Sequence, residues 1–101
     1  MLSDYKRIER QVLADGGEYK TVAFEGQELA FWGKSTSQYT AYLTPKESIA
    51  IISETGETTL EVFESFEEFE ERQKSDFLYP EEFASEIANA LDKEYTEELD
   101  I

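Results

Sequence analysis

Four glutamates spaced three and four residues apart are the pattern in this sequence that is nearest to a chemical site. Glu54, Glu57, Glu61 and Glu64 could supply the carboxylate pair of a glycosidase-type mechanism or the oxygen ligands of a magnesium ion. The sequence contains no Asp-x-Asp-x-Asp-Gly loop, and no neighbouring residue is placed to shift the pKa of one of these carboxylates. We therefore interpret them as part of a solvated acidic surface, and we expect no metal and no cofactor.

The residue types that most enzymes depend on are missing. The 101 residues include no His and no Cys, so the commonest general base, the usual activator of a catalytic serine and the thiolate nucleophile are all excluded. The five glycines match neither a phosphate-binding loop nor a dinucleotide fingerprint, and we interpret them as turn residues. The sequence thus predicts a protein that is not an enzyme.

Four aromatic residues could instead line a pocket for a small apolar ligand. They are Phe31, Trp32, Tyr39 and Tyr42. The alternative is that these large side chains fill the core of a small domain. Phe31 and Trp32 are adjacent, so in a strand they face opposite sides, and one of the two is available to a partner.

The acidic residues are concentrated in the second half of the chain. Of the net charge of -15, residues 1–53 carry seven acids against six bases, and residues 54–101 carry seventeen against three. Such a surface repels the phosphates of nucleic acids and of anionic lipids, so we expect neither as a partner. The candidate acidic face is Glu67, Glu68, Glu70 and Glu71, which could dock a basic protein surface.

The positions of these residues depend on the elements that carry them. Apolar, β-branched and aromatic residues separated by turn residues predict a strand-rich region over 5–63. Its expected strands are 5–13, 19–25, 29–32, 38–44, 48–53 and 58–63; a helix is the alternative for 5–13. The first two strands are joined by Asp15-Gly16-Gly17, which predicts a hairpin.

The hydrophobic period changes after residue 63, and the region 65–93 is predicted to be helical. Ser65 and Glu68 have the spacing of a capping box, which predicts a short helix that ends near Lys74. Pro80 suits the first turn of a second helix, whose apolar stripe is Phe83, Ile87, Ala90 and Leu91. The expected fold is a single α+β domain over 1–101, with a five- to six-stranded, mainly antiparallel sheet followed by two short C-terminal helices.

The start of the chain has no apolar run after its basic residues, and no apolar stretch reaches eighteen residues. These features disfavour both secretion and membrane insertion. We expect a cytoplasmic protein.

The tail over 95–101 alternates apolar and acidic residues, as a half-buried strand would. Its last five residues, Glu97-Glu98-Leu99-Asp100-Ile101, resemble the Glu-x-Leu-Asp-Ile signature of the bacterial EXLDI protein family, whose members are small proteins of about this length. The resemblance implies importance for Glu97, Leu99, Asp100 and Ile101, but it implies no activity.

Two roles are open for this tail. It could cover the core or a strand edge of its own chain, or it could be captured by another chain through strand addition, as in a homodimer that exchanges tails. Our leading functional hypothesis is a non-enzymatic protein-interaction or regulatory module that binds a basic protein surface or a second copy of itself. The alternative is a small-ligand binding domain with its aromatic pocket near Trp32.

Overall fold

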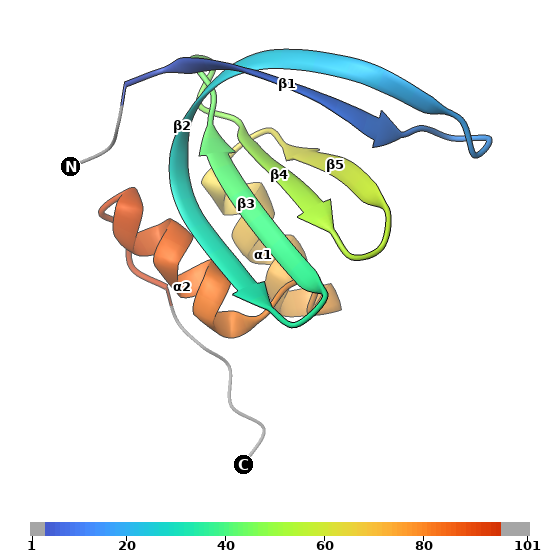
Figure 1. Ribbon diagram of the computed structural model, residues 1–101. Coiled ribbons are helices and arrows are strands. Elements are labelled where there is room, and N and C mark those ends of the chain that lie inside the picture. Colours follow the sequence, from blue (N-terminus) through green and yellow to red (C-terminus); the bar gives the residue numbers. More distant parts are fainter. Residues whose placement is uncertain (1–3, 96–101) are drawn as a thin grey trace.

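The computed structural model describes residues 4–95, which form five strands followed by two helices (Figure 1). The strands are β1 (Lys6–Leu13), β2 (Tyr19–Lys34), β3 (Ser37–Leu43), β4 (Ile49–Glu54) and β5 (Thr58–Phe63); the helices are α1 (Phe66–Asp76) and α2 (Glu81–Ala90). The predicted α+β class, with two C-terminal helices, is confirmed.

The sheet is an antiparallel meander in the order β1-β2-β3-β4-β5. It curls strongly, so that β1 and the first half of β2 form an arm that arches over one face of β3, β4 and β5, while both helices cover the other face (Figure 1). The curl brings β1 into contact with β5, although no strand pairing joins these two within residues 4–95.

The strands predicted over 19–25 and 29–32 are in fact one strand, β2, and this corrects the prediction of a break at Gly26. Gly26 keeps its place in the ladder by pairing with Lys6. A Cβ atom at Gly26 would lie 2.9 Å from the Cβ of Tyr42, closer than side chains tolerate. Glycine is therefore needed because the bent strand passes directly over Tyr42, and it allows the curl without ending the strand.

A β-bulge in β2 completes the change of direction. Glu28 pairs with Tyr42 and Ala30 with Ala41, so Leu29 is an extra residue between them. Both Leu29 and Ala30 are buried in the helix-facing core, where a regular strand would turn one of them to the other face. The bulge thus gives the second half of β2 its face against the helices.

The two faces of the sheet have separate hydrophobic cores. The larger one lies between the sheet and the helices and is built from β2, β3, β4, β5 and both helices; its fully enclosed side chains include Ile49, Ile51, Phe63, Phe69, Phe83 and Ile87. The smaller one lies under the arm and consists of Tyr42, Ala50 and Ile52, with Ile8, Phe24 and Leu60 packed against them. Alternate residues of β4 serve the two cores in turn.

Helix α1 begins as the sequence predicts. The Ser65 hydroxyl accepts a hydrogen bond from the Glu68 N–H at 3.1 Å, and Phe66 and Phe69 are buried. The Glu68 carboxylate, however, accepts from the N–H of Glu64, one residue before the expected Ser65. At the other end, Phe77 adopts a left-handed conformation and donates its N–H to the carbonyl of Gln73.

Gln73 is the buried polar residue that joins the two helices. Its side-chain amide donates to the Tyr79 carbonyl at 2.6 Å and accepts from the Tyr79 N–H at 2.9 Å. These bonds satisfy both backbone groups of a residue in the tight connection between the helices. The connection then enters α2 at Pro80, which lies at the N-cap, one position before the predicted first turn.

Helix α2 packs on the sheet with Phe83, Ala84, Ile87 and Ala88 fully buried. Ala90 and Leu91, which the sequence assigned to the same stripe, are partly buried against this core. Neither of the helices in the described part of the chain is long and apolar enough to cross a membrane.

We predict that Gly26→Ala lowers the free energy of unfolding by about 1–3 kcal/mol, because its methyl group overlaps the Tyr42 side chain and the arm must shift to relieve it. Urea denaturation followed by circular dichroism measures the change. Glu28→Ala, at an exposed position of the same strand, is the control and should change stability by less than about 0.5 kcal/mol. Equal effects of the two substitutions would contradict the close approach.

We also predict that Gln73→Leu lowers the free energy of unfolding by about 2–4 kcal/mol, because the Tyr79 N–H and C=O lose their partners while they stay buried. The measurement is again urea denaturation. The matched control is Gln38→Leu, at an exposed position of β3. If both variants are equally stable, the Gln73 amide does not hold the helix connection.

Candidate functional site

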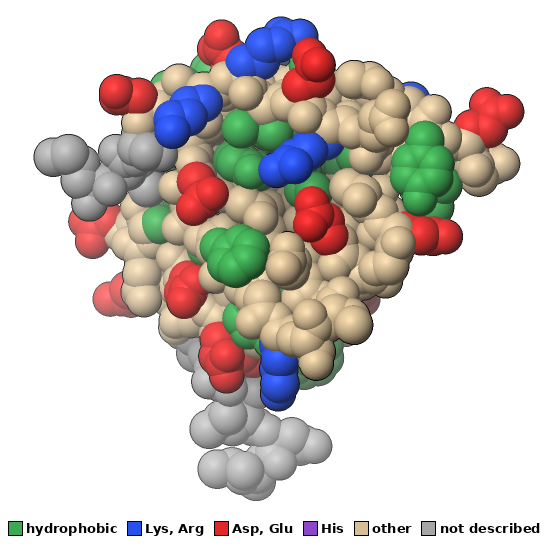
Figure 2. All heavy atoms as spheres, viewed as in Figure 1, with side chains coloured by type: hydrophobic (Ala, Val, Ile, Leu, Met, Phe, Trp, Pro, Cys, Tyr) green, Lys and Arg blue, Asp and Glu red, His purple; other side chains and the backbone are tan. Residues whose placement is uncertain are grey.

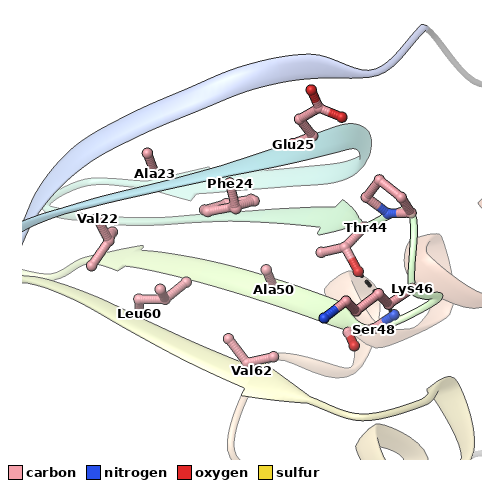
Figure 3. Close-up of a pocket in the computed structure, with 11 residues that line it drawn as sticks. Val22, Ala23, Phe24, Glu25, Thr44, Lys46, Ser48, Ala50, Leu60 and Val62 are labelled. Atoms are coloured by element: carbon pink, nitrogen blue, oxygen red, sulfur yellow. Dashed lines mark hydrogen bonds between the residues drawn. The ribbon is translucent and has the colours of Figure 1, made fainter.

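A pocket of about 480 Å³ opens between the arm and the rest of the sheet, on the face opposite the helices. We call it the arm cleft. Figure 3 shows its lining side chains, which come from β2, β4, β5 and the β3–β4 loop; the main ones are Val22, Phe24, Ala50, Leu60, Val62 and Lys46. The volume lies within the range of sites that hold small molecules or a few side chains of a partner.

The alternation of the strands directs apolar side chains into this cleft from two sides. Val22 and Phe24 reach down from β2, while Leu60 and Val62 reach up from β5 (Figure 3). The intervening Glu61 faces the helix layer, where it contacts Tyr79. Val62 keeps 55% of its surface exposed, which is high for an apolar side chain beside a core and marks the open side of the cleft.

The β3–β4 loop closes one end of the arm cleft. Thr44 donates its N–H to the Ser48 carbonyl at 3.0 Å, accepts from the Glu47 N–H, and accepts from the Ser48 N–H through its hydroxyl at 3.1 Å. The loop is therefore held by local hydrogen bonds. It presents Lys46 at the rim, with the ammonium group beside an apolar surface (Figure 3).

Further basic residues lie on the cleft-facing side of the arm. Residues directly opposite each other in an antiparallel pair point to the same side. Arg10 pairs with Val22, so it shares the side of a cleft-lining residue, and the strand period places Lys6 and Lys20 there too. Within residues 4–95, neither these three nor Lys46 takes part in an ion pair.

The space-filling view agrees with this arrangement. Figure 2 shows most of the visible basic side chains in its upper part, interspersed with acidic ones, near exposed hydrophobic side chains. In a chain with a net charge of -15, such a region is electrostatically distinct from the acidic helices.

The arm cleft is also bordered by the backbone edge of β5. This strand pairs with β4 on one side and is the last strand of the sheet, so its other side has no strand partner in the described part of the chain. Its outward N–H and C=O groups are a template on which another extended segment can pair.

The four aromatic residues singled out in the sequence do not converge on one cavity. Trp32 and Tyr39 lie on the helix side, with ring centroids 5.5 Å apart, and the Trp32 indole donates to Glu82 of α2 at 3.3 Å. Tyr42 lies on the opposite face, against Phe24. Phe31 is half exposed on the side of β2 away from the helices, so the expectation that it and Trp32 face opposite sides is confirmed.

The predicted acidic face on α1 is largely engaged within the chain. Glu67 forms an ion pair with Lys93 at 3.4 Å, Glu70 lies 4.0 Å from Lys74, and Glu68 caps the helix. Glu71 is exposed. Three of these four carboxylates thus have structural partners.

The candidate carboxylates Glu54, Glu57, Glu61 and Glu64 are also dispersed. Within residues 4–95, no three acidic residues are grouped so that they could hold a metal ion. Glu61 is the one with a marked effect on a neighbour: it accepts a hydrogen bond from the Tyr79 hydroxyl at 2.9 Å. Burial and, secondarily, the Glu61 charge raise the pKa of Tyr79 well above its usual value, so this hydroxyl stays protonated in the helix–sheet interface.

The arm cleft was missed in the sequence, and so was Gln73. The cleft walls follow the period-2 pattern of their strands, with Val22 and Phe24 on β2 and Leu60 and Val62 on β5. Neither strand's sequence indicates that the arm folds over β5. One pattern in the sequence could have indicated the cleft. The strands carry apolar residues on both faces of the sheet, but two short helices can cover only one face.

Comparison of the chain with protein-family models, with curated proteins and with solved structures finds no match. The resemblance of the tail to the EXLDI family therefore stays a prediction. Its residues Glu97, Leu99, Asp100 and Ile101 lie outside the described residues 4–95.

Proposed function

We propose that this chain is a non-enzymatic protein-interaction module that binds an extended, acidic segment of a partner chain in the arm cleft. The observation that carries the proposal is the position of an apolar cleft directly beside the edge of β5, which has no strand partner among residues 4–95. Together, these two features match what strand addition requires, namely main-chain bonds for affinity and a pocket for alternate side chains.

The apolar part of the recognition comes from the walls of the cleft. A bound segment would cover Val62 and fill the space between Phe24 and Leu60 with every second side chain. Each buried aliphatic side chain contributes about 1.5–3 kcal/mol before the cost of ordering the segment. Two or three such side chains would offset part of the cost of association, and the main-chain hydrogen bonds to β5 would have to contribute the rest.

The charge of the segment follows from the rim. Lys46 stands at one end of the cleft, and Arg10 is on the cleft-facing side of β1; neither has an ion pair within residues 4–95. Carboxylates that flank the apolar residues on the same side of the extended segment would reach these cations, whereas a basic segment would be repelled. The proposed partner is thus acidic at the bound segment, in contrast to the basic partner expected for α1.

A small apolar molecule is the second candidate occupant, and the observation in its favour is the cleft volume of about 480 Å³. This retains the small-ligand hypothesis but moves the site from Trp32 to the opposite face of the sheet. The segment is preferred because a small molecule leaves the β5 edge and the rim cations without a role.

The experiment is a fluorescence-polarisation titration of the full chain with two labelled peptides that have the same apolar residues. Both have valine at every second position, and at the two end positions on the valine side one carries glutamate and the other lysine. We expect the acidic peptide to bind and Val62→Asp to weaken its binding at least about tenfold, because a carboxylate would be buried against the peptide. The matched control is Thr59→Asp, which adds the same charge to β5 at an exposed position on the helix side.

Equal binding to the two aspartate variants would overturn the proposed site, and stronger binding of the lysine peptide would overturn the proposed partner charge. If neither peptide binds while an apolar dye binds the wild type and not Val62→Asp, the small-molecule alternative replaces the proposal.

A further inference from the structure

We propose that the segment which fills the arm cleft is residues 97–101 of a second copy of this chain, so that two copies exchange tails. This inference rests on the proposed function, because it names the partner of the same site. It starts from the match between the tail and the cleft.

The tail has the pattern that the arm cleft requires. Leu99 and Ile101 are two residues apart, so in an extended conformation both point to the same side. Glu98 and Asp100 alternate with them and point away. Such a segment can place two aliphatic side chains against Phe24 and Val62, while the carboxylate of Glu97, on the same side as Leu99, lies toward the rim, where Lys46 and Arg10 form no ion pair within residues 4–95.

The position of Tyr95 argues that the tail binds in another copy. Its hydroxyl donates to Glu81, at the start of α2, near the end of the sheet where Trp32 contacts Glu82. The arm cleft is on the opposite face, and its wall on β5 begins at Leu60, one residue beyond the row of Trp32. Across the strands, along them and through the layers, Leu60 is about 14, 3 and 10 Å from this end of α2, or about 17 Å in a straight line.

Four residues separate Leu99 from Tyr95, and a fully extended chain spans at most about 14 Å over that length. The straight line also passes through the core, so the real path around the sheet is longer. Leu99 of one copy therefore cannot reach its own arm cleft while Tyr95 stays on α2. Binding to a second copy removes this limit, and a two-fold arrangement lets both tails bind.

Net charge gives the exchange a distinctive dependence on salt. Two copies with a charge of -15 each repel one another over roughly 30 Å at about 0.01 M salt, but over only about 8 Å at physiological ionic strength. Added salt also leaves the apolar contacts of the tail intact. Self-association should therefore strengthen as salt rises, whereas a complex with a basic partner would weaken.

The test is molar mass by light scattering of the full chain over a range of concentrations, at about 0.01 M and about 0.15 M salt. The wild type should approach twice the chain mass of 11.7 kDa at the higher salt. Two variants should remain monomers: Val62→Asp, which cannot accept a tail, and the double variant Leu99→Ser with Ile101→Ser, which cannot donate one. Both should keep the wild-type melting temperature within a few degrees, because the helix-side core is untouched.

The decisive sample is an equimolar mixture of these two variants. One supplies an intact tail and the other an intact cleft, so the mixture should form a heterodimer through a single exchanged tail, although each variant alone is monomeric. The control mixture replaces Val62→Asp with Thr59→Asp, which should dimerise by itself.

A wild type that stays monomeric in both salts overturns the exchange. If that monomer still binds the acidic peptide, the proposed function stands and only the choice of partner fails; if it does not, both fail. A dimer that persists in Val62→Asp, or a mixture that stays monomeric, also overturns the exchange.

Discussion

The bend of β2 is the constraint on which the rest of the structure depends. One strand of 16 residues pairs with β1 through its first half and with β3 through its second half. Between these halves, Gly26 allows a close pass over Tyr42, and the extra residue Leu29 resets which side chains face the helices. Without this bend the arm would extend the sheet flatly, and neither the smaller core nor the arm cleft would exist.

The bend also explains why the two faces of the sheet differ in packing and in accessibility. The helix side is closed by large side chains and by hydrogen bonds that leave no buried side-chain nitrogen or oxygen unsatisfied in the described part of the chain. The core cluster on the arm side is small, with Tyr42, Ala50 and Ile52 buried in it, and Val62 beside it is exposed. Most of the stabilising burial is therefore on the helix side of the sheet, whereas the arm side stays accessible to a binding partner.

Local signals made much of the fold predictable. The Ser65 cap, the paired Phe66 and Phe69 and the stripe of α2 rest on contacts within a few residues, and each was readable from spacing. Gly26 was misread as the end of a strand, since a glycine required by a close pass over Tyr42 is indistinguishable in sequence from one that ends a strand. Gln73 could not be found, because its role depends on Tyr79, six residues away across a turn.

The candidate site was less predictable, for a related reason. The sequence suggested a pocket at Trp32 and Tyr39, but the bulge in β2 turns Trp32 to the helix side, and both residues pack against the core there. The cleft that does form joins Val22 and Phe24 to Leu60 and Val62, residues almost forty positions apart. Only the curl of the whole sheet brings them together.

The separation of the two cores has a consequence for how this protein tolerates change. Substitutions at Val22 or Val62 alter the walls of the cleft without disturbing the enclosed residues Phe69, Phe83 and Ile87. The fold can therefore serve as a scaffold whose binding surface is varied while its foldability is conserved. A library randomised at the cleft walls should yield mostly well-folded members with diverse specificities, as in the engineered use of antibody loops.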